Sequence, residues 1–193
     1  MVWKLIEEIE KYAKLNNIPI MLPDGILFLT NYIKKNNIKN ILEIGSAIGY
    51  SAIKMALINQ SIHITTIERD QERYEEALKN IKKFNLENQI KIIFDDAFNV
   101  NLTDKFDLVF IDAAKSQSIK FFEKFKINLN ENGTIITDNI NFHGLTKEKN
   151  IKNRNTRQLV RKINEYVDFL KNNQEFVTYF VEDGDGISIS KRS

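Results

Sequence analysis

Apolar residues recur along the chain with two different periods, and these periods predict helices and strands in turn. Helices are predicted where apolar residues recur every three or four positions, at residues 3–15, 24–35, 50–59, 70–85, 115–128 and 155–171. Strands are predicted where β-branched and aromatic residues run between turn residues, at residues 41–44, 61–68, 89–94, 106–112, 133–139, 175–181 and 186–190. The order of these elements indicates the fold class.

Five strands that alternate with helices, followed by a strand pair joined across Asp183–Gly186, predict an α/β fold with a doubly wound sheet. We expect a seven-stranded, mostly parallel sheet with helices on both faces and an antiparallel C-terminal hairpin. A length of 193 residues suits one domain, so we assign residues 1–193 to it. Residues 1–37 are expected to form N-terminal helices that cover the functional site.

The most informative stretch is Ile41–Ser51, in which an apolar run is followed by two glycines that open a helix. Gly45 and Gly49 allow the backbone to turn sharply and to approach a bound molecule, and the helix start presents free amide groups. The spacing lacks the third glycine of a dinucleotide site, and Glu43 would repel a phosphate. The loop therefore suits a cationic ligand such as S-adenosylmethionine, unless the glycines serve the turn alone.

Acidic residues stand at the ends of the predicted strands. Glu68 follows Glu43 by 25 positions and ends the second strand, where a nucleoside-binding α/β protein holds the ribose hydroxyls. Because parallel strands end at the same edge of a sheet, we expect one rim to carry Glu43, Glu68, Asp96, Asp112 and Asp138. Since so many like charges are unfavourable together, a bound cation is expected at this rim.

Part of the rim predicts a metal site. Asp112, Asp138 and Asn139 offer only oxygen ligands, and the chain has no cysteine, so Mg²⁺ or a similar ion is expected there. A turn or a helix cap after a strand would also explain the pair Asp138 and Asn139.

Three side chains near the rim or in the strands can carry protons. Lys115 follows Asp112 by one helical turn, and a nearby divalent ion would disfavour its ammonium form, so it is a candidate base for a hydroxyl proton. A solvated lysine at a helix start is the alternative. His63 lies inside an alternating strand and is interpreted as structural, whereas His143 follows the metal pair and is a candidate for substrate contact.

Composition narrows the class of protein without identifying a partner. The formal net charge is +2 and the pI is about 8.6, which is too mild to indicate nucleic acid by itself. The absence of cysteine excludes disulfides and fits a reducing cytosol. Because no long apolar run occurs near the N-terminus, we predict neither a signal peptide nor a membrane span, and we expect a soluble cytoplasmic protein.

Over residues 18–190 the motifs resemble, in order, those of the metal-dependent O-methyltransferases typified by the catechol and caffeoyl-CoA enzymes. The resemblance rests on Glu43–Ala56, Glu68, Asp112–Lys115 and Asp138–Asn139. It implies a Rossmann-like class I methyltransferase fold that binds S-adenosylmethionine and Mg²⁺. Relatives carry an additional N-terminal segment where this sequence has one short helix.

The resemblance also implies a role for each matching residue. The cofactor-binding residues would be Met21, Glu43, Gly45, Gly49, Ser51, Glu68, Asp96, Ala97 and Asp112. The metal ligands would be Asp112, Asp138 and Asn139, and the catalytic residues would be Lys115 and Asp112. Met21 would pack against the cofactor, Asp96 and Ala97 would border its adenine, and Lys115 would act as the general base.

Within this superfamily, five segments look most like the bacterial tRNA 5-hydroxyuridine methyltransferases: Ile18–Gly25, Ile67–Asp70, Ile111–Lys115, Thr137–Asn139 and Phe142–Gly144. These enzymes methylate the 5-hydroxyl of the wobble uridine, position 34, to give 5-methoxyuridine. Residues 147–171 would then hold the phosphates of the anticodon loop, and Phe142 is a candidate to stack on a base. The basic residues concerned are Lys147, Lys149, Lys152, Arg154, Arg157, Arg161, Lys162 and Lys171. Resembling enzymes are usually homodimers, so we expect a homodimer.

Other functions stay open on the residues alone. A small-molecule, catechol-type O-methyltransferase would share every rim residue and would need no basic surface. A nucleotide-binding or RNA-binding module without catalysis would not need Asp112, Lys115 and the pair Asp138–Asn139 together, and a dinucleotide oxidoreductase is disfavoured by the glycine spacing. A solvated basic helix would equally explain the charge of residues 147–171.

Overall fold

The computed structural model describes residues 2–141, 144–148 and 151–193. Its central strand is β1 (Asn40–Ile44), which is buried from Ile41 onward. β1 lies between β2 (His63–Glu68) and β4 (Phe106–Ile111) and runs parallel to both. Strands covered on both faces need apolar side chains on both faces, which explains the nearly continuous β-branched and apolar runs at these positions.

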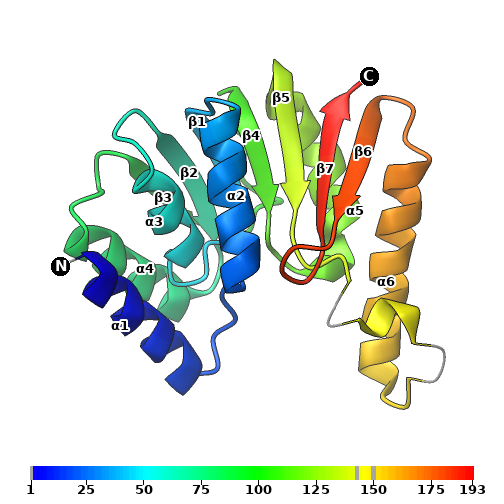
Figure 1. Ribbon diagram of the computed structural model, residues 1–193, viewed down its shortest axis with the longest axis horizontal. Coiled ribbons are helices and arrows are strands. Elements are labelled where there is room, and N and C mark those ends of the chain that lie inside the picture. The colour runs from blue at the N-terminus through cyan, green and yellow to red at the C-terminus, as the bar shows by residue number, and fades with distance from the viewer. Residues whose placement is uncertain (1, 142–143, 149–150) are drawn as a thin grey trace.

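The sheet has seven strands in the order β3-β2-β1-β4-β5-β7-β6 (Figure 1). The remaining strands are β3 (Ile90–Phe94), β5 (Leu129–Thr137), β6 (Phe176–Val181) and β7 (Ile187–Arg192). β3 pairs with β2 and β5 pairs with β4 in parallel, whereas β7 lies between β5 and β6 and is antiparallel to both. The predicted mostly parallel sheet with an antiparallel C-terminal hairpin is therefore confirmed.

Helices cover both faces of this sheet (Figure 1). They are α1 (Val2–Leu15), α2 (Pro23–Lys35), α3 (Tyr50–Ala56), α4 (Gln71–Lys83), α5 (Ser118–Phe125) and α6 (Arg154–Lys171). The helices α1 to α4 contribute to one apolar cluster, with Leu29 and Ile53 at its centre, and α5 and α6 contribute to the other with Phe122 and Tyr166. Each cluster removes apolar surface from water, which is worth about 25 cal/mol per Å².

Two helices differ in length from the sequence prediction. The helix expected over residues 50–59 ends at Ala56, because the chain turns there to enter β2. The helix expected over residues 115–128 is divided into a 3₁₀ turn η1 (Lys115–Gln117), α5 and a second turn η2 (Lys126–Asn128). The division follows from Ser118, whose amide and hydroxyl both donate to the carbonyl oxygen of Lys115 and so close a tighter turn.

The connections place loops rather than helices at the carboxyl edge of the sheet. Residues 95–105, between β3 and β4, contain no helix, so the expected alternation of strands and helices is interrupted there. The extended residues 19–22 join α1 to α2 at the same edge, and the Tyr50 hydroxyl donates to the Glu10 carboxylate at 2.8 Å, which fastens α1 to the start of α3. In the described part of the chain no helix is both long and apolar enough to cross a membrane.

Candidate active site

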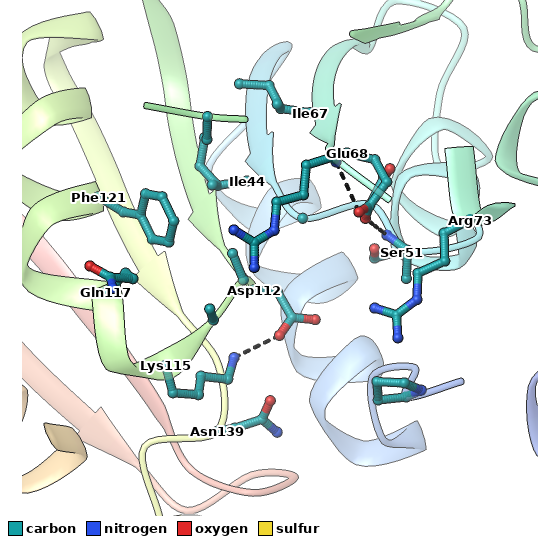
Figure 2. Close-up of a pocket in the computed structure, with 18 of the residues that line it drawn as sticks. Ile44, Ser51, Ile67, Glu68, Arg73, Asp112, Lys115, Gln117, Phe121 and Asn139 are labelled. Atoms are coloured by element: carbon teal, nitrogen blue, oxygen red, sulfur yellow. Dashed lines mark hydrogen bonds and ion pairs between the residues drawn. The ribbon is translucent and has the colours of Figure 1, made fainter. Parts of the chain in front are cut away.

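A cavity of about 940 Å³ opens at the carboxyl ends of β1, β2 and β4. Its walls are formed mainly by residues 19–22, 44–47, 67–69, 95–98 and 112–117. Because the strands are parallel, the loops that follow them converge at this edge. Figure 2 shows charged side chains from several of these loops pointing into the same space.

The glycine loop after β1 has the close backbone approach that the sequence predicted. Gly45 has φ of 93°, and a Cβ atom built there would lie 2.6 Å from the carbonyl oxygen of Asp112. No other residue fits without moving the backbone of the neighbouring loop. Gly49 has a φ of 81°, which favours glycine, and a Cβ there would make only an ordinary contact with Ala77 of α4 at 3.4 Å. Gly49 therefore serves the turn into α3 and does not line the cavity.

Glu68 at the end of β2 is a rigidly held acceptor. Its carboxylate accepts hydrogen bonds from the amides of Ala47 at 2.8 Å and of Arg69 and Asp70 at 2.9 Å each. Ala47 itself has a left-handed φ of 45°, so this contact holds the glycine loop in shape. A carboxylate has about four acceptor positions. Three are used here, which leaves capacity for a hydroxyl of a ligand in the cavity.

Glu43 occupies a different place from the one its sequence position suggested. It is fully buried within β1, does not line the cavity, and accepts hydrogen bonds from Ser51 Oγ at 2.5 Å and Thr66 Oγ1 at 2.6 Å. Burial, with smaller contributions from the charges of Asp112 and Glu68, raises its pKa to about 7 against the opposing effect of the two hydroxyls. Ser51 does line the cavity, so Glu43 is connected to the cavity through its hydrogen bond with Ser51.

Asp112 and Lys115 form an ion pair inside the cavity. Lys115 Nζ lies 2.7 Å from Asp112 Oδ1, and the two side chains are only 14% and 22% exposed (Figure 2). Both residues come from the loop that follows β4, and the 3₁₀ turn η1 fixes the position of the lysine. The arrangement places a proton carrier and a carboxylate side by side on one wall.

Asp138 follows β5 and carries an unsatisfied oxygen. The residue is 1% exposed, and its Oδ1 atom has no hydrogen-bond partner within the described residues. Burial first, and then the negative charges of Asp112 and Asp185, raise its pKa to about 7, although Lys115 acts in the opposite direction. An orphaned buried carboxylate oxygen beside a second carboxylate is unfavourable unless a cation accompanies it.

The donor set therefore fits a hard divalent cation. Asn139 lines the cavity next to Asp138 and has a left-handed φ of 58°, a conformation that asparagine tolerates at turns. With Asp112 these residues offer two carboxylates and one amide oxygen, which are ligands that Mg²⁺ accepts. Among the described residues no three side chains of Asp, Glu, His or Cys form a metal-binding group, so an amide oxygen and water would have to complete the shell.

The part of the cavity lined by Asp96 and Phe98 is partly aromatic. Asp96 accepts the Phe98 amide at 2.9 Å, which together with Arg69 at 3.2 Å lowers its pKa. The Phe98 ring stacks on Phe121 with centroids 4.7 Å apart. Ala97 is buried beside them, and all of these residues line the cavity. Such a wall suits a flat, uncharged ring.

The other residues singled out in the sequence divide into three groups. Met21 is buried and lines the cavity, with its methyl group near Gly25. His63 is exposed at the start of β2, at the other end of the strand from the cavity. Phe142 and His143 lie outside the described residues, and so do Lys149 and the side chain of Lys147.

Three cavity residues were missed by sequence reasoning. Ser46 is 2% exposed, and its hydroxyl has no hydrogen-bond partner among the described residues. Arg73 reaches the cavity from the first turn of α4. Asp185 reaches it from the turn between β6 and β7, because β7 pairs with β5 and brings that turn beside Asp138. Asp185 could have been predicted as a cavity residue only if the antiparallel pairing of β7 with β5 had been predicted first.

Comparisons with known proteins agree with this geometry. The sequence model of a family described as O-methyltransferase matches residues 2–193. A caffeoyl-CoA O-methyltransferase of Populus kitakamiensis is 29% identical over 193 residues, covering 95% of this chain and 82% of the relative. A protein of Arabidopsis thaliana, provisionally named a caffeoyl-CoA O-methyltransferase, is 34% identical over 146 residues; the match covers 72% of this chain and 62% of the relative's length.

Solved structures show the same likeness in three dimensions. A Staphylococcus aureus protein, provisionally named a caffeoyl-CoA O-methyltransferase, superposes with a TM-score of 0.91 at 39% identity, covering 97% of this chain and 92% of that one. An O-methyltransferase from Bacillus cereus, solved in complex with SAH, has a TM-score of 0.85 at 22% identity, covering 98% and 91%. At that identity the second comparison bears on the fold alone.

Proposed function

The chain belongs to the O-methyltransferase family, and from this premise we propose that it transfers a methyl group from S-adenosylmethionine to an oxygen atom of an acceptor. The observation that carries the proposal is the single cavity wall on which Asp112, Lys115 and Asn139 meet, with Glu68 facing them (Figure 2). The match of residues 2–193 to the O-methyltransferase family supports S-adenosylmethionine as the methyl donor.

The cofactor is expected to lie along the cavity from the aromatic wall to the glycine loop. Its adenine would border Asp96 and Ala97, and a ribose hydroxyl would donate to the remaining acceptor position of Glu68. Met21 would pack against its chain, and Ser51, held by Glu43, would contact the methionine end. The protein contributes mainly alignment, because a fixed in-line approach removes much of the entropic barrier.

Asp112, Asp138 and Asn139 would hold a divalent cation, for which we propose Mg²⁺. When bound, such an ion supplies positive charge that orients the acceptor hydroxyl and stabilises its oxyanion. The unsatisfied oxygen of Asp138 supports the assignment. Burial first, and then the charges of Asp112 and Asp185, raise the pKa of that carboxyl, and a bound cation would offset these charges.

Lys115 is the proposed proton acceptor. Transfer breaks the bond between sulfur and the methyl carbon and forms a bond from that carbon to the acceptor oxygen, whose proton must leave. Lys115 Nζ lies on the cavity wall, and its ion pair with Asp112 holds it toward the site. It takes the proton only after losing its own to solvent, and any neighbour that weakens the hold of Asp112 on the ammonium favours that loss.

For the acceptor we propose the 5-hydroxyl of 5-hydroxyuridine at the wobble position of tRNA. The support is the basic end of α6. Lys152, Arg154 and Arg157 are exposed, whereas Arg161 and Lys162 are both near Glu165, at 3.4 and 2.7 Å. Exposed lysine and arginine side chains that have no acidic partner among the described residues can bind the phosphates of a nucleic-acid backbone.

The position of this basic end also supports a large acceptor. Leu159 of α6 lines the cavity, and α6 packs against η1, which carries Lys115. A polyanion on Lys152, Arg154 and Arg157 would therefore lie beside the cavity and could present one base to it.

A small catechol-type acceptor is the second candidate. The Populus, Arabidopsis and Staphylococcus relatives described above are named for caffeoyl-CoA and not for tRNA. Such a substrate would use the same Asp112, Lys115 and Asn139 and would be indifferent to the charge of α6.

One assay distinguishes the two acceptors. The protein is incubated with S-adenosylmethionine, Mg²⁺ and either tRNA bearing 5-hydroxyuridine or a catechol, and the products are identified by mass spectrometry. We expect 5-methoxyuridine in the tRNA nucleosides, and none with the matched variant Lys115→Met. Methylation of the catechol alone would contradict the tRNA proposal and keep the family activity, whereas no methylation of either would contradict both.

The subunit number and the compartment stay predictions. We expect a homodimer from the resemblance and a cytoplasmic location from the absence of cysteine. Light scattering of the purified protein tests the first.

A further inference from the structure

We propose that Arg73 binds the carboxylate of the methionine part of S-adenosylmethionine. The inference rests on the cofactor proposed above and adds a contact that the sequence motifs did not assign. Arg73 lines the cavity from the first turn of α4 and is partly buried. In Figure 2 its side chain extends into the cavity, and its guanidinium lies below Ser51 in that view.

The position of Arg73 follows from how α4 packs. Ala77 is the residue of α4 that lies against Gly49, at the end of the glycine loop. Arg73 is four positions earlier and so lies on the same helix face, one turn closer to the cavity. Because α4 packs against the glycine loop through Ala77, Arg73 comes to line the cavity from the first turn of the helix.

The Arg73 guanidinium has no ion-pair partner within the described part of the chain. Four basic residues line the cavity: Arg69, Arg73, Lys115 and Lys120. Arg69 pairs with Asp96 and Lys115 pairs with Asp112, and Lys120 is exposed at the mouth. No hydrogen bond or ion pair joins the Arg73 guanidinium to any described side chain. A guanidinium has five N–H donors, and a partly buried one needs acceptors for them. A bound carboxylate would supply two such acceptors.

The acids around the cavity explain why the cofactor needs such a contact. The methionine tail carries an ammonium group and a carboxylate. Glu68, Asp112 and Asp185 give the wall a negative potential that suits the ammonium and repels the carboxylate. A guanidinium that forks onto both carboxylate oxygens removes this repulsion. The unsatisfied hydroxyl of buried Ser46 is an independent sign that the same space accepts a polar ligand.

The test compares two ligands that differ only in the carboxylate. S-adenosylmethionine and decarboxylated S-adenosylmethionine are titrated into the intact protein by calorimetry, for wild type, Arg73→Met and Arg73→Lys. We expect Arg73→Met to bind S-adenosylmethionine about 10-fold to 100-fold more weakly and the decarboxylated ligand within about threefold of wild type. Arg73→Lys should lie between, because it keeps the charge and loses the fork.

The control is Lys79→Met, which removes a charge from an exposed position of the same helix and should leave both affinities unchanged. If Arg73→Met weakens the binding of both ligands equally, or of neither, the assignment is overturned while the proposed function stays intact. A wild-type protein that binds neither ligand overturns the proposed cofactor itself and the assignment with it. Thermal unfolding of each variant verifies that it is folded. If Arg73→Met does not fold, the comparison of Arg73→Lys with wild type provides the test.

Discussion

Glu43 shows how one residue can be important without touching a ligand. Its carboxyl has a pKa of about 7 in the folded protein against 4.5 as the ordinary value. Between those two pH values the folded state holds a proton that the unfolded state has lost, so stability falls as the pH rises from 4.5 to 7. The shift corresponds to about 3 kcal/mol across that window.

Glu43→Gln should remove this pH dependence. Glutamine keeps the shape and can still bond the hydroxyls of Ser51 and Thr66. We expect the variant to gain stability relative to wild type by about 2 to 3 kcal/mol between pH 4.5 and 7.5, and no more at higher pH. Chemical unfolding at several pH values measures this difference, and parallel profiles for the two proteins would contradict it.

Asp138 presents the opposite balance between stability and function. Asp138→Asn removes a buried charge, so at pH 8 and in EDTA the variant should be more stable than wild type by about 1 to 3 kcal/mol. It should also lose binding of Mg²⁺ or Mn²⁺, measured by calorimetry, and any rise in melting temperature on adding either ion.

The matched control is Asp107→Asn at the other end of β4. Asp107 accepts the amides of Lys39 and Asn40 and the side chain of Asn130, and these contacts lower its pKa against burial, which acts in the opposite direction. Its replacement should therefore reduce stability and leave ion binding unchanged. An Asp138→Asn protein that binds the ion normally would refute the proposed site.

At the scale of elements, the loop after β1 depends on the absence of a side chain at Gly45. Gly45→Ala places a Cβ 2.6 Å from a backbone oxygen of the neighbouring loop at a φ of 93°. Gly144 also has a positive φ of 77°, but no atom of the described residues lies within 4 Å of a Cβ built there. Gly144→Ala should therefore cost only the backbone strain, about 1 kcal/mol, and Gly45→Ala at least about 2 kcal/mol more.

Denaturant unfolding of the two glycine variants, with calorimetric titration of S-adenosylmethionine, measures both effects. We expect only Gly45→Ala to weaken the cofactor. Equal losses of stability in the two variants would show that the close approach to Asp112 is unimportant.

The elements were predictable because their signals are local. Runs of β-branched residues identified every strand, and the Asp70 cap fixed the start of α4, where its carboxylate accepts the Arg73 amide. The break between η1 and α5 was not predictable, because it depends on which bond the Ser118 hydroxyl makes. Glu43 was placed on the rim because it precedes the glycine loop, but it lies one residue inside the strand, where alternate side chains face a helix layer.

At the scale of the whole molecule, the site combines residues that no local pattern connects. Glu68, Asp96 and Asp112 could be brought together from the sequence, because they follow parallel strands that end at one edge. Arg73 and Asp185 could not, because their positions depend on the packing of α4 against Gly49 and on the pairing of β7 with β5. The cofactor, metal and catalytic roles of all these residues stay predictions until ligands are measured.

The charge distribution gives a prediction at this scale. Replacing Lys152, Arg154 and Arg157 together by alanine should weaken tRNA binding. It should also lower the slope of log affinity against log salt concentration by about 2 to 3, while leaving the affinity for S-adenosylmethionine unchanged. Fluorescence titration of labelled tRNA at several salt concentrations measures the slope.

A matched triple variant on α4 controls for the loss of three charges. Lys79, Lys82 and Lys83 are also exposed, and α4 lies at the other end of the molecule from α6 in Figure 1. Their replacement should leave tRNA affinity nearly unchanged. Equal effects of both triple variants would indicate general attraction of a polyanion and not a defined surface.

The insertion of β7 between β5 and β6 has a consequence for the order in which the molecule is completed. During synthesis β5 and β6 emerge from the ribosome before β7, the strand that lies between them. One edge of β5 therefore stays unpaired until β7 has been made. Asp185 arrives together with that segment. A nascent chain can therefore already contain most of its core while the cavity still lacks Asp185 and one edge of β5 is still unpaired, and an unpaired strand edge can associate with another chain.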